Sequence, residues 1–131
     1  MIGLDTNVLV RYIVQDDRAQ SLRATAVIDA LTRDDPGFIP LVTLVELVWV
    51  IESSYDAEKP EVVAILDRLL RTQELVIENA GVVISALDRF RKSKADFADC
   101  LIERSASAAG CPYTISFDEK AIKTAGMRAV D

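Results

Sequence analysis

The sequence predicts an α/β domain, a three-layer α/β/α sandwich with a mostly parallel central sheet. Short apolar runs alternate along the chain with longer segments in which apolar residues recur every three or four positions. The chain has 131 residues, 50% of them hydrophobic, which suits one globular domain over residues 1–131. It contains no repeats, low-complexity tracts or long Gly/Ser linkers that would divide it.

The expected elements follow one another in alternation. Residues 1–4 are expected to form a strand, and a helix begins near Thr6. Later strands are predicted at residues 38–41, 75–78 and 113–117, the first and last of them after segments with Pro and Gly. Three helices are predicted from i, i+3, i+4, i+7 spacing, in the sets Ala24, Val27, Ile28 and Leu31; Val62, Ile65, Leu66 and Leu69; and Val83, Ala86, Leu87 and Phe90.

The composition excludes several kinds of chemistry. The chain has no histidine, which removes the usual imidazole acid or base, the triads built on it and the commonest ligand of transition metals. Any catalysis must therefore use carboxylates. The net charge of -6 disfavours broad electrostatic attraction to nucleic acid. Because no apolar run is long enough for a membrane helix and the start lacks a signal-peptide pattern, we expect a cytoplasmic protein.

Two aspartates stand where expected strands end. Asp5 follows the apolar start in "MIGLDTN", and Asp118 follows the strand of "YTISFDEK". Parallel sheets bind ligands beyond the carboxyl ends of their strands, so both carboxylates are expected at one sheet edge. The alternative is that each aspartate only caps the helix that follows it, because Asp is a favoured N-cap residue.

Glu46 stands in the apolar segment "LVTLVELVWVIE". Its helical neighbours three and four residues away are apolar apart from Thr43, which indicates a buried position. Burying a carboxylate is costly unless it is paired or bound to a metal, and the segment contains no Lys or Arg. The alternative is a glutamate that reaches water at a helix end.

Asp96 and Asp99 lie three residues apart in "SKADFADCLIER", so one helix face carries both. The alternative is a solvated acidic stripe that Glu103 continues one turn later.

A shared pocket explains these carboxylates better than a separate cause for each. Acidic side chains that share a pocket repel one another, and a divalent cation reverses the sign of the local field. Oxygen ligands suit Mg²⁺ or Mn²⁺. We therefore predict a metal site formed by Asp5, Glu46, Asp96, Asp99 and Asp118.

The order of these motifs resembles a PIN domain, and more closely the VapC-type ribonuclease toxins of toxin-antitoxin pairs. The matching stretches span nearly the whole chain and are "IGLDTNVLVRYIVQDD", "TLVELVWVI", "ADFADCLIERSASAAGC" and "TISFDEKA". The resemblance implies a homodimeric α/β/α protein whose acidic pocket holds Mg²⁺ or Mn²⁺ and cleaves single-stranded or looped RNA. By motif, it implies four catalytic acids, which are Asp5, Glu46, Asp99 and Asp118.

The resemblance also gives expectations for neighbouring residues. The resemblance leaves three roles open for Asp96. It binds the metal itself, it holds a metal-binding residue in place, or it binds the metal instead of Asp99. Thr6 and Asn7 are expected to hold the first aspartate in place. Ser116 faces the same side of its strand as Asp118, because side chains alternate along a strand.

In metal-assisted hydrolysis a metal-bound water attacks the phosphorus, which needs no histidine and does not use the RNA 2'-hydroxyl. We therefore expect products with a 5'-phosphate and a 3'-hydroxyl. The resemblance implies a VapB-type antitoxin whose C-terminal segment covers the pocket, often with a basic side chain among the acids. Candidates for gripping the RNA backbone are Arg11 and a basic run, which consists of Arg89, Arg91, Lys92 and Lys94. The run also fits an ordinary solvated helix end.

Two other hypotheses stay open. One is a PIN-like module that binds a partner and cleaves nothing. The other is a Mg²⁺-dependent phosphatase of the haloacid-dehalogenase type, which needs a second aspartate two residues after the first. This chain has Asn7 at that position, which disfavours a phosphatase.

Overall fold

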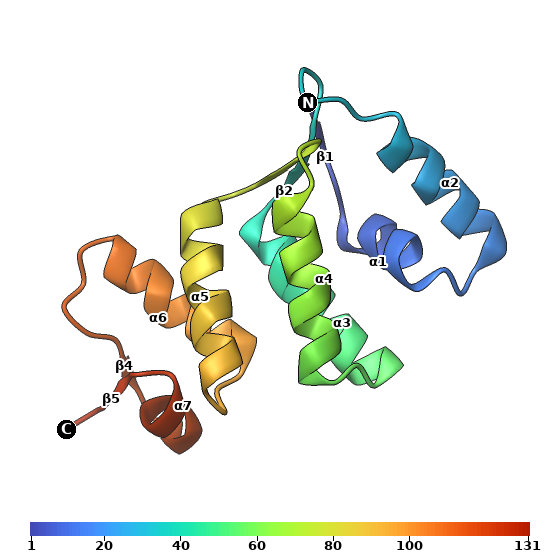
Figure 1. The fold of residues 1–131 in the computed structure, drawn as a ribbon. Coiled ribbons are helices and arrows are strands. Elements are labelled where there is room, and N and C mark those ends of the chain that lie inside the picture. Colours follow the sequence, from blue (N-terminus) through green and yellow to red (C-terminus); the bar gives the residue numbers. More distant parts are fainter. The chain divides into compact units, whose positions relative to one another are not determined.

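The computed structural model describes all residues from Met1 to Asp131, and they form two compact units, Met1–Glu78 and Asn79–Asp131. The first unit consists of β1 (Ile2–Gly3), α1 (Thr6–Val14), α2 (Arg18–Asp29), β2 (Gly37–Ile39), α3 (Leu41–Tyr55), α4 (Lys59–Arg71) and β3 (Leu75–Ile77). The second consists of α5 (Ala80–Lys92), α6 (Phe97–Ala108), β4 (Ile115–Ser116), α7 (Glu119–Thr124) and β5 (Arg128–Ala129) (Figure 1). The expected single domain over residues 1–131 stays a prediction.

In the first unit, β1, β2 and β3 form a parallel sheet in that order. Gly37 of the middle strand pairs with Ile2 on one side and Leu75 on the other. Two helices separate each strand from the next, which gives the long connections that parallel strands require. Gly37 suits the centre of this sheet because a β-carbon there would lie 2.8 Å from side-chain atoms of both Leu4 and Leu31.

The helices of the first unit bury one apolar face each. Helix α1 packs on α2 and α3, α3 packs on α4, and α4 contacts β3 (Figure 1). Fully buried side chains form the core of this unit, and they include Leu9, Ile39, Leu44, Leu47, Ile51, Val62 and Leu66. The predicted strand at residues 38–41 ends at Ile39, because Pro40 is the N-cap residue of α3.

In the second unit, α5 packs along α6 and the strands β4 and β5 pair in parallel. The rings of Phe90 and Phe97 meet edge to face, with centroids 5.8 Å apart, and both side chains are buried. Helix α7 lies between the two strands in sequence and contacts both. Strand β5 was not predicted, because its two exposed residues carry no apolar pattern.

All strand pairs in both units are parallel, and the three helices predicted from apolar spacing are present as α2, α4 and α5. The predicted α/β class is therefore confirmed. Helix α2 ends at Asp29, so Leu31 of the first predicted set lies just beyond it. None of the helices combines the length and the apolar character needed to cross a lipid bilayer.

Candidate active site

Asp5 is the N-cap residue of α1. Its Oδ1 atom accepts a hydrogen bond of 2.7 Å from the backbone N–H of Thr6. Its extended backbone, with φ -84° and ψ 162°, is the conformation that N-cap residues adopt. Asp5 thus caps the helix, and its carboxylate is still exposed. Capping occupies Oδ1 and leaves Oδ2 open to a further ligand.

Glu46 lies on the exposed side of α3, and the predicted buried position is wrong. The helix buries a stripe on its other side, formed by Thr43, Leu44, Leu47, Val48 and Ile51. The apolar neighbours of Glu46 in the sequence did not imply burial, because two of them, Val42 and Trp49, are exposed as well. They have 68% and 67% of their surface open to solvent. The hydroxyl of Thr6 donates a hydrogen bond of 2.9 Å to Oε1 of Glu46.

Thr6 therefore connects two of the predicted acids, through its N–H to Asp5 and through its hydroxyl to Glu46. Both carboxylates line a cavity of about 430 Å³ in the first unit. The other residues that line it are Thr6, Asn7, Val10, Arg11, Val50, Ser54 and Tyr55. Asn7 lines the cavity without a hydrogen bond to Asp5, so of the two residues expected to hold this aspartate, Thr6 does so directly.

A second cavity, of about 360 Å³, lies between β1, α1 and α2. It has mostly apolar walls and no acidic residue, and it shares Asn7 and Arg11 with the cavity of Asp5 and Glu46. Of these two cavities, the one that contains Asp5 and Glu46 is therefore the candidate for acid chemistry.

The remaining predicted acids, Asp96, Asp99 and Asp118, lie in the second unit. Asp96 precedes α6 and pairs with Nζ of Lys120 at 2.8 Å. Asp99 lies half-buried in the first turn of that helix. Its partial burial raises the pKa of its carboxyl group, and the negative charges of Asp96 and Asp118 raise it further, whereas Lys120 opposes them.

Asp118 is the N-cap residue of α7, and its Oδ1 atom accepts hydrogen bonds from the N–H groups of Lys120 at 2.9 Å and Ala121 at 3.3 Å. The hydroxyl of Ser116 accepts a hydrogen bond of 2.9 Å from the backbone N–H of Asp118. Ser116 thus fixes the backbone that carries this aspartate. Both predicted strand-end aspartates act as helix caps, which orients their carboxylates.

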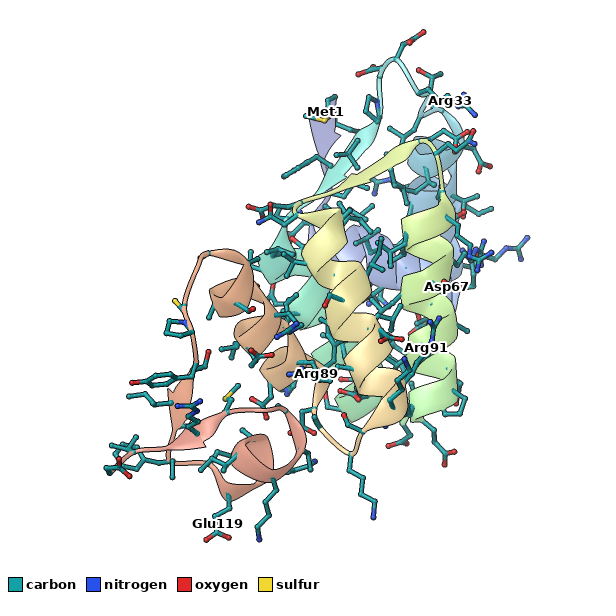
Figure 2. All side chains as sticks on the ribbon, turned by 60° about the vertical axis from the view of Figure 1, so that its left-hand side comes forward. Met1, Arg33, Asp67, Arg89, Arg91 and Glu119 are labelled. Atoms are coloured by element: carbon teal, nitrogen blue, oxygen red, sulfur yellow. The ribbon has the colours of Figure 1, made fainter.

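Glu103 is buried, so it does not continue a solvated acidic stripe, which was the alternative considered for this helix face. Its carboxylate accepts hydrogen bonds from Arg89, labelled in Figure 2, and from Nε and Nη2 of Arg104 at 2.7 and 3.1 Å. Arg104 and Arg89 lower the pKa of Glu103 by hydrogen bonding and by their charge. Arg89 also donates a hydrogen bond of 2.7 Å to the carbonyl of Ala125. The first residue of the predicted basic run therefore has a structural role.

The donor atoms suit a hard divalent cation, because every candidate ligand is a carboxylate oxygen. Burial, together with the charges of Asp96 and Asp118, raises the pKa of Asp99, and a bound cation would favour the charged form of this carboxylate. Neither unit by itself gathers three acidic side chains at the spacing of a metal site. Since Mg²⁺ keeps several water ligands and is often held by one or two carboxylates, the pair Asp5 and Glu46 fits such an ion.

A parallel α/β fold with carboxylates at strand ends agrees with the comparison to known families. Residues 2–127 match the PIN domain, and the chain belongs to the PIN-domain family. This assignment is consistent with the predicted α/β/α sandwich. The chain is also similar to a VapC ribonuclease from Aquifex aeolicus (strain VF5), with 22% identity over 128 residues, which cover 98% of this chain and 94% of that protein.

Proposed function

We propose that this protein is a Mg²⁺- or Mn²⁺-dependent endoribonuclease and the toxin of a VapBC-type toxin-antitoxin pair. The observation that carries the proposal is the pair of carboxylates, Asp5 and Glu46, which Thr6 connects within one cavity. Membership of the PIN-domain family and the similarity to a VapC ribonuclease along nearly the whole chain support this activity.

We assign Asp5, Glu46 and Asp99 as the principal metal-site carboxylates. Asp118 completes the site or holds a second, weaker ion, and Asp96 supports Asp99 or replaces it as a ligand. A divalent cation bound by these groups would activate a water molecule for attack on phosphorus and offset charge on the phosphoryl oxygens. Because the chain has no histidine, a metal-free route through the RNA 2'-hydroxyl lacks its usual acid and base.

Within the first unit, the side chains of the site are already ordered. The N–H of Thr6 fixes one oxygen of Asp5, and the Thr6 hydroxyl fixes one oxygen of Glu46. The other carboxylate oxygen of each acid takes part in neither of these hydrogen bonds. Ordering the ligands beforehand reduces the entropy lost when a cation binds. In the second unit, Ser116 and the N–H groups of α7 orient Asp118 in the same manner.

The ends of the RNA fragments test this proposal most directly. Purified protein is incubated with unstructured RNA and Mn²⁺, and the fragments are tested for a 5'-phosphate and a 3'-hydroxyl by ligation and by phosphatase treatment. We expect both groups at the cleavage site and no cleavage in EDTA. A cyclic phosphate, or full activity in EDTA, contradicts the mechanism. Binding of Mn²⁺ by calorimetry without any cleavage would favour the inactive PIN-like module.

The proposed partners follow from the family resemblance and from charge. A VapB-type antitoxin would present a basic segment to the carboxylates, and the net charge of -6 favours such a partner. We also propose a cytoplasmic homodimer, with the exposed Trp49 as a candidate contact. Light scattering after gel filtration measures the mass of the assembly. A monomer at micromolar concentration contradicts the homodimer and leaves the nuclease proposal unaffected.

A further inference from the structure

Arg11, in the last turn of α1, is held by three side chains from different segments. Its Nε donates a hydrogen bond of 2.8 Å to Oε1 of Gln20, and its Nη1 donates to Oδ1 of Asp16 at 2.8 Å and to the hydroxyl of Tyr55 at 3.2 Å. The Tyr55 hydroxyl in turn donates a hydrogen bond of 2.7 Å to Oδ2 of Asp16. The guanidinium group is therefore fixed in position before any ligand arrives.

These bonds use only part of what Arg11 can donate. A guanidinium group has five N–H donors. The Nε donor and the two Nη1 donors have protein partners, and the two Nη2 donors have none. The side chain keeps 29% of its surface exposed. Arg11 thus has an ordered pair of donors available on a cation that never loses its charge near neutral pH.

Arg11 is the one basic residue among those that line the cavity of Asp5 and Glu46. Tyr55, which orders it, lines the same cavity. RNA presents a phosphate at every nucleotide, so a strand whose scissile phosphate lies beside the two carboxylates brings neighbouring phosphates close to them as well. Carboxylates repel those phosphates, and a fixed guanidinium group attracts them through paired, charge-assisted hydrogen bonds.

We propose that Arg11 binds a backbone phosphate of the RNA strand, next to the phosphate that is cleaved. This inference rests on the proposed ribonuclease function and adds a substrate contact to it. Asp16, Gln20 and Tyr55 act as positioning residues that hold the guanidinium group so that its Nη2 donors stay available. The contact is to the sugar-phosphate backbone, so Arg11 contributes affinity and register and does not select the base.

The test separates phosphate binding from a purely structural role. Asp5→Asn protein, which is expected to be inactive, is titrated with a short fluorescent oligouridylate, and anisotropy is recorded from about 50 to 200 mM salt. Adding Arg11→Met to this parent should weaken RNA binding roughly tenfold, because the RNA phosphate loses a hydrogen bond to a charged group. It should also reduce the slope of log affinity against log salt by about one. Arg71→Met removes an exposed arginine of the same unit and should change neither quantity.

Two further variants keep the inference testable if Arg11→Met folds poorly. Arg11→Lys retains the charge but not the fork, so it should keep the salt slope and bind more weakly. Tyr55→Phe removes a hydroxyl that orders Arg11, so it should weaken binding with the slope unchanged. If Arg11→Met lowers the melting temperature while affinity and salt slope stay as in the parent, Arg11 is structural and the inference is wrong.

Failure of this inference can be told apart from failure of the proposed function. Active wild-type protein together with an unchanged salt slope in Arg11→Met overturns the role of Arg11 alone. Wild-type protein that cleaves no RNA, together with a reduced slope in Arg11→Met, overturns the nuclease activity and leaves RNA binding by Arg11 in place. Absence of RNA binding by the Asp5→Asn parent itself overturns the inference.

Discussion

The hydroxyl of Thr6 donates a hydrogen bond of 2.9 Å to Glu46, a residue 40 positions further along the chain. Thr6 is the first residue of α1 and Glu46 lies in the middle of α3, so this bond joins two helices at the cavity. The backbone N–H of the same threonine holds Asp5. One small residue thus sets the separation of the two carboxylates on which the proposed metal site depends.

Thr6→Val should impair the site without disturbing the fold. Valine matches threonine in shape but has no hydroxyl, so Glu46 loses its hydrogen-bond partner while the N–H bond to Asp5 persists. Loss of such an outer partner typically costs about 10–100-fold in metal affinity or activity. Mn²⁺ titration calorimetry and RNA cleavage rates measure the effect. Thr6→Ser keeps the hydroxyl and should behave nearly as wild type; equal losses in both variants would mean that the bond is irrelevant.

Asp5→Asn should remove cleavage and preserve the structure. The amide oxygen still accepts the capping hydrogen bond from Thr6, but the group no longer carries the charge that a cation requires. We expect activity to fall by at least about 100-fold, the upper range for residues that only support a ligand. Cleavage assays and thermal unfolding are measured on the same preparation. A variant that unfolds, or one that keeps its activity, would show that Asp5 serves only as a cap.

Asp99→Asn should stabilise the metal-free protein at neutral pH. Burial and the charges of Asp96 and Asp118 raise the pKa of Asp99 in the folded state. The folded state therefore binds this proton more tightly than the unfolded state, and stability falls as pH rises from the usual pKa of 3.8 through the raised folded value. The advantage of Asp99→Asn over wild type should be largest above that window and vanish below it.

Urea unfolding in EDTA at several pH values measures this difference. The exposed loop variant Asp34→Asn serves as the control for the loss of one surface carboxylate. Adding Mn²⁺ should then stabilise the wild type more than Asp99→Asn, because the cation offsets the repulsion. A variant that is less stable than wild type at neutral pH in EDTA would contradict the repulsion inferred for Asp99.

Glu103→Gln should destabilise the second unit. The substitution leaves Arg89 and Arg104 without their shared buried anion. We expect a loss of roughly 2 kcal/mol, below the ~3–5 kcal/mol for a fully buried pair, because both arginines are partly exposed. Asp88→Asn removes an exposed ion pair with Lys92 and should cost less than about 0.5 kcal/mol.

The effect of Glu103→Gln should also depend on pH. The two arginines lower the pKa of Glu103, so the stability it contributes is fully present above its usual pKa of 4.5 and is lost as pH falls through the folded value. Urea unfolding at neutral and acidic pH should therefore show the two proteins converging in acid. A difference that persists unchanged at low pH would indicate that packing, and not charge, is responsible.

If the chain folds as a single domain, calorimetry should show one unfolding transition. Leu47 lies in the core of the first unit and Leu87 in the core of the second. Replacing either by alanine should cost about 2–5 kcal/mol and shift the whole transition downward, if both units unfold together. Two separate transitions, each moved by one of the two variants, would show that the units are independent domains.

Local spacing predicted the helices well and the surroundings of individual acids poorly. Residues such as Val62, Leu66 and Leu69 mark a helix face, and α4 buries that face as expected. The burial of Glu103 was missed because one of its cationic partners, Arg89, lies 14 residues away. In the sequence, the adjacent Arg104 was the one residue that indicated a cationic partner for Glu103. Glu46 was misjudged for the opposite reason, since exposed apolar neighbours made its segment look buried.

By itself, the sequence determined the α/β class and the exclusion of histidine chemistry, and it offered helix capping by Asp5 and Asp118 as an alternative that the structure then showed. These properties depend on apolar spacing, on residue type and on neighbours in the chain, all of which can be read locally. Only the tertiary structure decided that Thr6 links Asp5 to Glu46 and that Tyr55 and Asp16 hold Arg11 at the same cavity. Those contacts join residues from separate helices and loops, and packing of the core, rather than local preference, brings them together.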